Sequence, residues 1–373
     1  MTSGQMRLIT AEQVSPSEGL SVDEALANQA PNRTMHEPWT LKLYTYKDHA
    51  LLTGRYQRIE AEVDLSTLRS NPTIGINRRP TGGGTILMGS GQLGVALTHH
   101  ANSNWSPREG IKDFGSAIAY ALSNLGIDAR LRGKNDLEVG GKKICGLGIY
   151  KDASGGVLNH ASILFDLDYE LLLSVLAVPD IKLAAHRSKT VSSRVTTVSA
   201  ELGRTVNPLE YIKVIADALA LYFGAKISKG HLSDEEHSLA QDLQREKYET
   251  DDWIFLSTAN KHLRHTSVQV RSHVGTLEVN LELQGPTIQS AIITGDFNVY
   301  TWELALIETY LKWQPLDPKR LRVRLHEIEH SVAHIVDIEH LLQALCTAQV
   351  HSEISSPIRI GSCYVPEEYH IAK

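Results

Sequence analysis

Apolar positions recur at helical spacing in three segments of the first two thirds of the chain. Residues 15–30 start with serine and proline and continue with apolar residues every three or four positions, which predicts an early helix. Residues 113–126 carry one apolar face, and we expect Asp113 to cap that helix. Residues 207–225 predict a third helix, with Asn207 as its cap and a proline in its first turn.

Strand patterns lie between these helices. Residues 39–46 and 49–57 are rich in β-formers and predict two strands. Residues 135–150 predict two more strands, joined by a pair of adjacent glycines that is a strong hairpin signal. Residues 156–168 predict a further strand.

The pattern changes towards the C-terminus. Residues 234–252 contain eight acidic and two basic positions, which predicts a solvated helical connector. Residues 276–283 alternate leucine or valine with polar residues, as is typical of a half-buried strand, and residues 287–297 predict its partner. Helical patterns follow over residues 301–312 and from residue 335 to residue 348.

These elements predict an α+β protein with two domains and a tail. We expect residues 1–245 to form a domain with a mixed or antiparallel β-sheet flanked by helices. Residues 246–350 would form a small α+β domain, and residues 351–373 a C-terminal tail. The length of 373 residues also suits about two domains of ordinary size.

Composition and charge narrow the class of protein without naming a function. Hydrophobic residues make up 42%, charged residues 21%, and the net charge is -6, so we expect an ordinary globular protein without a nucleic-acid partner. No apolar run approaches the roughly 18 residues of a membrane span, and the start has no apolar signal segment, so we expect no membrane and a cytoplasmic location. The cysteines Cys145, Cys346 and Cys363 are too scattered for a disulfide framework, and we interpret them as reduced thiols.

Three short motifs match known patterns, but their surroundings favour simpler interpretations. Residues 89–94 match the dinucleotide-binding GxGxxG, yet a strand-like run follows where a helix is needed, which favours a glycine-rich hairpin or loop. Residues 326–330 match the zinc motif HExxH, yet they lie in a tract of acids and histidines typical of a solvated helical face. The histidine pair in residues 98–100 has no activated nucleophile nearby and favours a surface position.

The segment RRPTGGGT, residues 78–85, is the first candidate for chemistry. Three successive glycines let backbone N–H groups approach a ligand and allow positive φ angles, which suits phosphate or carboxylate oxygens. Arg78 or Arg79 would add a forked donor for the same anion. The alternative is a tight glycine turn with surface arginines. The candidate ligand-binding residues here are Arg78, Arg79, Thr81, Gly82, Gly83 and Gly84.

Two later segments add to this candidate site. Lys143 precedes a run of apolar and small residues, so it is able to contact a carbonyl or phosphate oxygen in a pocket, although most lysines are simply exposed. In the third segment, His160 stands beside Ala161 and a serine.

Taken in order, these segments resemble the motifs of the lipoate–protein ligase family. The resemblance rests on RRPTGGGT, GKNDLEVGGKKICG, HASILFDLD and SSRVTTV and covers roughly residues 20–200. The C-terminal part is similar to that family's small accessory domain. Thr81 and Cys145 each replace a serine of the family pattern, and Asn159-His160-Ala161 replaces His-His-Gly. These departures affect which acyl group we expect the protein to bind, and they leave the expected class of enzyme unchanged.

The resemblance implies an ATP-dependent reaction in two steps, in which lipoate or octanoate becomes acyl-AMP and the acyl group then passes to a lysine of an acceptor protein. Lys143 would be catalytic, and Asp136 would hold Mg²⁺. The implied partner is an E2 lipoyl domain, a glycine-cleavage H protein or a related lipoate-binding protein, and a monomer is compatible with the sequence. Further residues implied in substrate or ATP binding are Asn135, Asp136, Gly146, His160, Ala161, Ser193 and Arg194.

Three alternatives stay open. An octanoyltransferase of the same fold would use a cysteine thioester and no ATP, and Cys145 is the one cysteine among the motifs. A protein that binds lipoyl-adenylate without transferring it would keep the same pocket. A biotin–protein ligase fits the RRPTGGGT segment and the C-terminal part less well.

Overall fold

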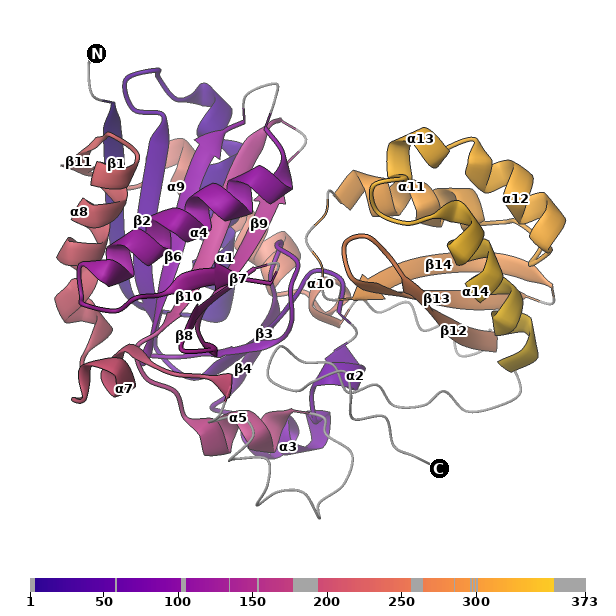
Figure 1. Ribbon diagram of the computed structural model, residues 1–373, viewed down its shortest axis with the longest axis horizontal. Coiled ribbons are helices and arrows are strands. Elements are labelled where there is room, and N and C mark those ends of the chain that lie inside the picture. Colours follow the sequence, from indigo (N-terminus) through magenta and orange to yellow (C-terminus); the bar gives the residue numbers. More distant parts are fainter. Residues whose placement is uncertain are drawn as a thin grey trace.

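The computed structural model divides into two lobes, of which the larger contains the N-terminus (Figure 1). Its α+β architecture confirms the fold class expected from the sequence. Among the residues described, no helix has both the length and the apolar character that crossing a bilayer requires. The structure describes residues 4–57, 59–101, 105–133, 135–152, 154–176, 194–255, 264–284, 286–295, 297, 299 and 301–351.

The larger lobe is built on a mixed sheet of eight strands in the order β11-β1-β2-β6-β10-β9-β8-β7. Strand β1 is parallel to both of its neighbours, and the remaining neighbouring pairs are antiparallel. The strands are β1 (Gln5–Val14), β2 (Trp39–Tyr46), β6 (Gln92–His100), β7 (Arg130–Arg132), β8 (Asp136–Val139), β9 (Lys142–Lys151), β10 (Gly156–Leu164) and β11 (Lys226–Lys229).

Helices cover both faces of this sheet (Figure 1). Alternate residues of β2 point to opposite faces. Leu41 and Leu43 therefore join the core under α4 and α8, whereas Tyr44 and Tyr46 join the core under α1. Helix α9 packs against α1. The helices are α1 (Pro16–Asn28), α4 (Pro107–Ser123), α7 (Val198–Leu202), α8 (Ile212–Tyr222) and α9 (Asp234–Leu243), with short 3₁₀ turns at Ala30–Asn32 and Pro208–Tyr211.

The three helix predictions for this lobe had different outcomes. The early helix is confirmed, and Ser15 caps it in a reciprocal capping box. Asn207 is confirmed as a cap, although the first turn after it is a 3₁₀ turn that leads into α8. Asp113 was the wrong cap. Ser106 caps α4 instead, and Pro107 in its first turn starts the helix six residues earlier than Asp113.

A small three-stranded sheet supports the glycine-rich segment. Its order is β4-β3-β5, and residues 79–85 form the loop from β4 to β5. The core beneath it includes Leu51, Ile59 and Leu172. The elements are β3 (Ala50–Thr53), β4 (Gly75–Arg78), β5 (Ile86–Met88), α2 (Ile59–Glu62), α3 (Leu65–Ser70) and α5 (Tyr169–Val175).

The smaller lobe contains a separate antiparallel sheet with helices packed on it (Figure 1). The predicted alternation over residues 276–283 is confirmed, because its leucines and valines are buried in that lobe's core. The elements are β12 (Arg264–Arg271), β13 (Thr276–Gln284), β14 (Thr287–Gly295), α11 (Thr301–Leu311), α12 (Pro318–His326), α13 (Glu329–Val332) and α14 (Ile338–His351).

The segment that joins the lobes belongs structurally with the larger one. A π-helical turn (Gln244–Tyr248) and α10 (Asp251–Phe255) follow α9. The ring of Tyr248 is fully buried against the first lobe, and Trp253 Nε1 donates to the carbonyl of Arg78 at 2.9 Å. We therefore propose to place the domain boundary after Phe255 rather than near residue 245. Nearly all of the predicted tail lies outside the described residues.

Candidate functional site

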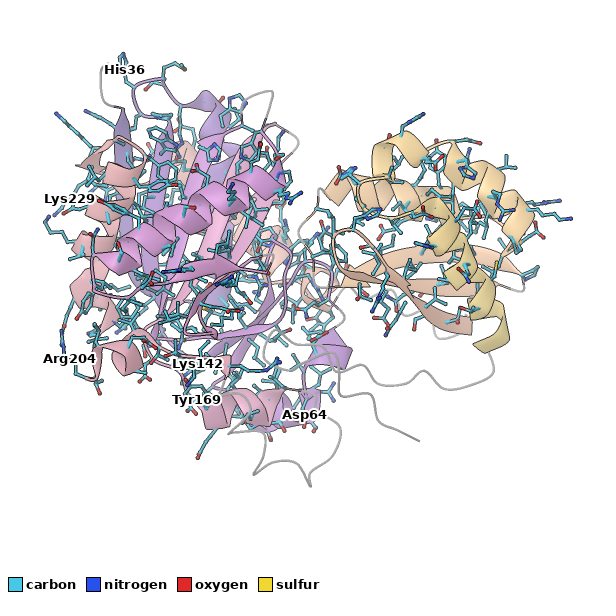
Figure 2. All side chains as sticks on the ribbon, viewed as in Figure 1. His36, Asp64, Lys142, Tyr169, Arg204 and Lys229 are labelled. Atoms are coloured by element: carbon cyan, nitrogen blue, oxygen red, sulfur yellow. The ribbon has the colours of Figure 1, made fainter. Side chains whose placement is uncertain are left out.

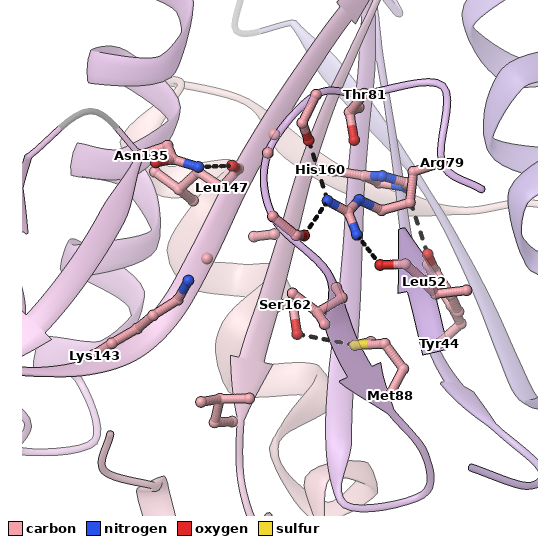
Figure 3. Close-up of a pocket in the computed structure, with 18 residues that line it drawn as sticks. Tyr44, Leu52, Arg79, Thr81, Met88, Asn135, Lys143, Leu147, His160 and Ser162 are labelled. Carbon is pink, nitrogen blue, oxygen red and sulfur yellow. Dashed lines mark hydrogen bonds between the residues drawn. The ribbon is translucent and has the colours of Figure 1, made fainter. Parts of the chain in front are cut away.

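A pocket opens between the small sheet and the α1 face of the large sheet (Figure 3). Its walls come from the glycine-rich loop and from β2, β9 and β10. The pocket volume is about 50 Å³. Since a cavity that admits benzene measures about 150 Å³, an acyl chain would have to move side chains to enter. Met88 is an unbranched and adaptable member of this wall.

Glycines on neighbouring strands make room for the pocket. Across the sheet, Tyr44 stands opposite Gly94, Gly94 opposite Ser162, and Ser162 opposite Gly146. A Cβ atom on Gly94 would lie 2.6 Å from the Tyr44 ring, so only glycine lets that ring lie across the strand. Gly148 stands opposite His160 on the neighbouring strand. A Cβ atom on Gly148 would lie 2.8 Å from Thr81 Oγ1.

Hydrogen bonds from Arg79 to backbone carbonyls hold the triple-glycine loop in place. Arg79 is buried and donates to the carbonyl of Leu52, to that of Gly82 at 3.1 Å and to that of Gly84 at 2.8 Å. Gly83 has φ of 94°, which requires glycine. Its carbonyl leaves no space for a side chain at Gly54, where a Cβ atom would lie only 1.8 Å away. Arg79 therefore shapes the loop as well as lining the pocket.

One backbone N–H of this loop is directed towards the smaller lobe. The Gly83 N–H donates to the carbonyl of Phe297 at 3.2 Å. The Phe297 ring stacks on Tyr56 of the larger lobe, with 4.9 Å between ring centres. In this arrangement the lobes meet beside the loop, and the Gly83 N–H has a protein partner instead of a ligand.

Arg78 lies outside the pocket, contrary to the sequence prediction of a ligand contact. Its guanidinium is fully buried and donates to backbone carbonyls of two segments. These carbonyls belong to Gly54, Arg55 and Gln57 in the β3–α2 connection and to Trp253 and Ile254 in α10. A buried cation must be satisfied by such acceptors, so Arg78 holds these two segments together.

Thr81 supplies a polar atom that faces the pocket without a protein partner. Its side chain is fully buried, and no group in the described part of the chain hydrogen bonds to Oγ1. Buried hydroxyls are normally paired. The unpaired oxygen is therefore available to a water or a ligand atom in the pocket.

Lys143 and the glycine loop line the same pocket, although they come from different sheets. Figure 3 shows the Lys143 ammonium and the Arg79 guanidinium on opposite sides of it. Lys143 is 6% exposed, and its Nζ pairs with Asp136 Oδ1 at 2.7 Å. The hairpin predicted at Gly140-Gly141 is confirmed, and it brings β8 with Asp136 beside β9.

The other predicted residues fall into two groups. Asn135 lines the pocket, but its amide donates to the carbonyl of Leu147 at 3.1 Å. Gly146, His160 and Ala161 also line it. Arg194 is exposed and is not among the lining residues, and Ser193 lies outside the described residues. The backbone of the adjacent turn does reach the site, because the Thr196 N–H donates to the Lys143 carbonyl at 2.8 Å.

Sequence reasoning missed a buried network behind His160. Asp23 on α1 accepts hydrogen bonds from Lys42 Nζ at 2.8 Å, from Tyr44 Oη at 2.8 Å and from His160 Nε2 at 2.5 Å. Burial raises the pKa of Asp23, but Lys42 and His160 together outweigh it and hold the pKa below its usual value. A carboxylate only accepts, so His160 carries its proton on Nε2. The available signal was a lysine inside the apolar run of residues 39–46.

The surroundings of Cys145 do not suit a thioester, and those of Asp136 do not suit a metal site built from several protein ligands. The Cys145 thiol points away from the pocket into the core under α4, and burial raises its pKa. The described residues contain no group of three metal-ligating side chains. Asp136 is a single carboxylate paired with Lys143, so only an ion held mainly by phosphate and water would suit it.

The structure shows the local surroundings of the three short motifs. Residues 89–94 form the turn between β5 and β6 and the start of β6, and since these strands lie in different sheets, the segment is a glycine-rich loop rather than a hairpin. The HExxH tract is split, because α12 ends at His326 and α13 begins at Glu329. His99, from the histidine pair, packs edge-on against Trp105.

The chain belongs to the family described as the lipoyl protein ligase A/B catalytic domain. The family model matches residues 15–220, which is more than half of the chain and most of the larger lobe. This match includes the glycine loop, Lys143 and the strand that carries His160.

Relatives within this family have two different activities in their names. Octanoyltransferase LipM of Brevibacillus brevis is 26% identical over 67% of this chain and 98% of its own length. Lipoate-protein ligase LplJ of Bacillus subtilis is 24% identical over 68% of this chain and 75% of its own length.

Solved structures of similar fold include lipoate–protein ligases. The bipartite lipoate protein ligase of Thermoplasma acidophilum, described together with its E2 lipoyl domain, has a TM-score of 0.60 at 25% identity, over 70% of this chain and all of that one. A lipoate-protein ligase A bound with ATP has a TM-score of 0.58 at 25% identity, over 68% of this chain and 98% of that one. LipL1 of P. falciparum shares only the fold, with a TM-score of 0.68 at 16% identity, over 94% of this chain and 99% of that one.

Proposed function

We propose that this protein is an ATP-dependent lipoate–protein ligase that also accepts octanoate. The observation that supports this most directly is the shared pocket of Lys143, Arg79 and the glycine loop, with the unpaired Thr81 hydroxyl inside it. A ligand with two anionic groups, a carboxylate and a phosphate, suits such a set of donors.

In the first step, a carboxylate oxygen of the acyl substrate attacks the α-phosphorus of ATP, and pyrophosphate leaves. Charge develops on oxygens that need fixed positive groups and donors near them. Lys143 is placed for this role once its ammonium turns from Asp136 to the ligand. Asp136 orients the lysine until the anion arrives.

In the second step, the neutral amine of an acceptor lysine attacks the acyl carbon, and AMP leaves with the electrons of the broken C–O bond. The amine nitrogen loses a proton to solvent. Lys143 stabilises the oxyanion that forms on the acyl group. Mg²⁺ would accompany ATP and lower the charge of its phosphates, but we assign no step to Asp136 as a metal ligand because it pairs with Lys143.

Two observations favour the ligase over a cysteine-dependent octanoyltransferase. Within the described residues, the pocket lining contains no cysteine, and the Cys145 thiol lies on the other face of the sheet. The match to LipM covers 98% of that protein, whereas the match to LplJ, over a similar share of this chain, covers 75% of the ligase and leaves part of it beyond the match. The fold of LipL1 covers both lobes.

The acceptor that we propose is a lipoyl domain or a related lipoate-binding protein, since the Thermoplasma ligase is described with its E2 lipoyl domain. A cytoplasmic location, a monomeric state and the absence of a nucleic-acid partner remain predictions from the sequence.

The test is to incubate the full chain with lipoate, ATP and Mg²⁺ and to weigh several apo-acceptors by mass spectrometry. A parallel reaction contains octanoyl carrier protein without ATP. Acyl transfer and pyrophosphate release only in the presence of ATP would support the ligase. ATP-independent transfer together with an acyl-enzyme mass would establish the octanoyltransferase instead. Pyrophosphate release without transfer to any acceptor would leave an adenylate-forming protein.

A further inference from the structure

The inner end of the pocket is closed by a buried polar wall. Tyr44 and His160 line the pocket, and both donate to the same oxygen of Asp23. Behind them, Asp23 Oδ1 pairs with Lys42 Nζ at 2.8 Å. The side chains of Asp23 and Lys42 are 0% and 2% exposed. A fixed pair of opposite charges therefore lies directly behind the lining residues.

Lys42 also lines a second cavity, on the far side of this wall. The volume of that cavity is about 370 Å³, against about 50 Å³ for the pocket. Its lining comes from β1, α1, the connection before α9 and the start of α9. This cavity is open to solvent, since it includes the buried residues Ile9 and Val14 together with the exposed residues Thr10, Glu18, His231, Asp234 and His237. Contacts run from the pocket through Tyr44 and His160 to Asp23, then to Lys42, and from there to the second cavity.

Lys42 links the residues of this wall because it contacts both Asp23 and Tyr44. Besides pairing with Asp23, its Nζ lies 4.0 Å from the centre of the Tyr44 ring and donates to the Gly19 carbonyl at 2.8 Å. A cation held against an aromatic face restrains that ring. Any chain that extended past Tyr44 would have to displace two paired charges into an apolar surrounding, which is costly.

We propose that the Asp23–Lys42 pair separates the pocket from the second cavity and thereby limits the length of acyl chain that this protein accepts. The inference rests on the proposed function in taking the ligand to be an acyl chain with its carboxylate near Lys143. Lys42 is then a positioning residue that sets specificity, and removing the pair would let a longer chain reach the apolar residues Ile9, Val14 and Val22 of the second cavity.

The test compares binding of octanoate and dodecanoate to the full chain by isothermal titration calorimetry, without ATP or acceptor. The double variant Asp23→Asn/Lys42→Met removes both charges together and replaces the fixed ammonium by a flexible thioether chain that an acyl chain can push aside. We expect the affinity for dodecanoate relative to octanoate to rise at least about tenfold, since each additional buried methylene strengthens binding severalfold. Affinity for octanoate itself should change by less than about threefold, because the carboxylate end keeps its donors.

A matched control is Glu24→Gln/Lys247→Met. This variant removes another ion pair of α1, at 2.7 Å, whose residues line neither cavity. It should keep the wild-type preference. If the first variant does not fold, Asp23→Leu/Lys42→Leu replaces the same pair by apolar residues, a change that buried ion pairs often tolerate.

The outcomes separate this inference from the proposed function. An unchanged preference in a variant that melts cooperatively overturns the partition, whatever reaction the protein catalyses. A changed preference in a protein that never releases pyrophosphate supports the partition and rejects the ligase. Failure of the wild-type protein to bind octanoate, dodecanoate or lipoate overturns both.

Discussion

Two lysine–aspartate pairs stand at opposite ends of one pocket, and their lengths are nearly equal. Lys143 and Asp136 are 2.7 Å apart, and Lys42 and Asp23 are 2.8 Å apart. The Asp136 side chain is 27% exposed, whereas that of Asp23 is fully buried. Water can replace a partner at the first pair but not at the second. A lysine and an aspartate can therefore form either an exchangeable contact or a fixed wall, and the burial of the pair determines which of the two they form.

The largest expected effect concerns stability at the buried pair. Asp23→Ala should lower the free energy of unfolding by about 3–5 kcal/mol, because it leaves Lys42 buried without its counter-charge. Asp136→Ala should cost less than about 1 kcal/mol, since water reaches that pair. Urea unfolding followed by circular dichroism measures both variants. Equal losses in the two variants would contradict the distinction between an exchangeable pair and a fixed one.

The second expected effect concerns the rate of the reaction. Here Lys143 should matter more than the buried Lys42–Asp23 pair, the reverse of their order for stability. Lys143→Ala should retain the fold and lower the rate of pyrophosphate release by about 10²–10³-fold, or roughly 3–4 kcal/mol of transition-state stabilisation. The thermal midpoint serves as the control for folding. Full activity in this variant would remove Lys143 from the mechanism and leave the exchangeable pair without a function.

The third effect is the pH dependence of stability. The pKa of Asp23 is held below its ordinary value of 3.8 by Lys42 and His160, against the effect of burial. A carboxyl group with a lowered folded pKa stabilises the protein above its unfolded pKa, and that contribution is lost as the pH falls through the folded pKa. Below about pH 4, the wild type should therefore lose stability more steeply than Asp23→Asn/Lys42→Met, by at most about 1.4 kcal/mol per pH unit. Parallel curves from urea titrations at several pH values would reject this reasoning.

The same contrast explains what the sequence could predict. Lys143 and the glycine loop were found because they lie in local motifs whose order is informative, and the GxG spacing of Gly146 and Gly148 marks a strand face without side chains. Asp23, Lys42 and His160 come from three separate elements, and only the pairing of β2, β6 and β10 under α1 brings them together.

Local patterns were also insufficient where tertiary contacts decide a residue's role. Arg78 and Arg79 are adjacent and look equivalent in sequence. The direction of β4 turns one guanidinium to the carbonyls of α10 and the other to the glycine loop. The alternation in β13 was predictable because one face of a strand packs on a single core, which requires no knowledge of distant segments.

The smallest expected effect concerns the Thr81 hydroxyl, which lies against Gly148 between the two pairs. Thr81→Val replaces the unpaired buried hydroxyl by a group of the same shape. Stability should stay the same or rise slightly, because no described protein group loses a hydrogen bond. If the hydroxyl instead meets the substrate, KM for lipoate or ATP should rise about tenfold, which corresponds to one hydrogen bond of roughly 1.4 kcal/mol. Thr81→Ser, which retains the oxygen, should restore the wild-type KM. A loss of stability without any change in KM would show that the hydroxyl serves the fold, as the buried Asp23–Lys42 pair does.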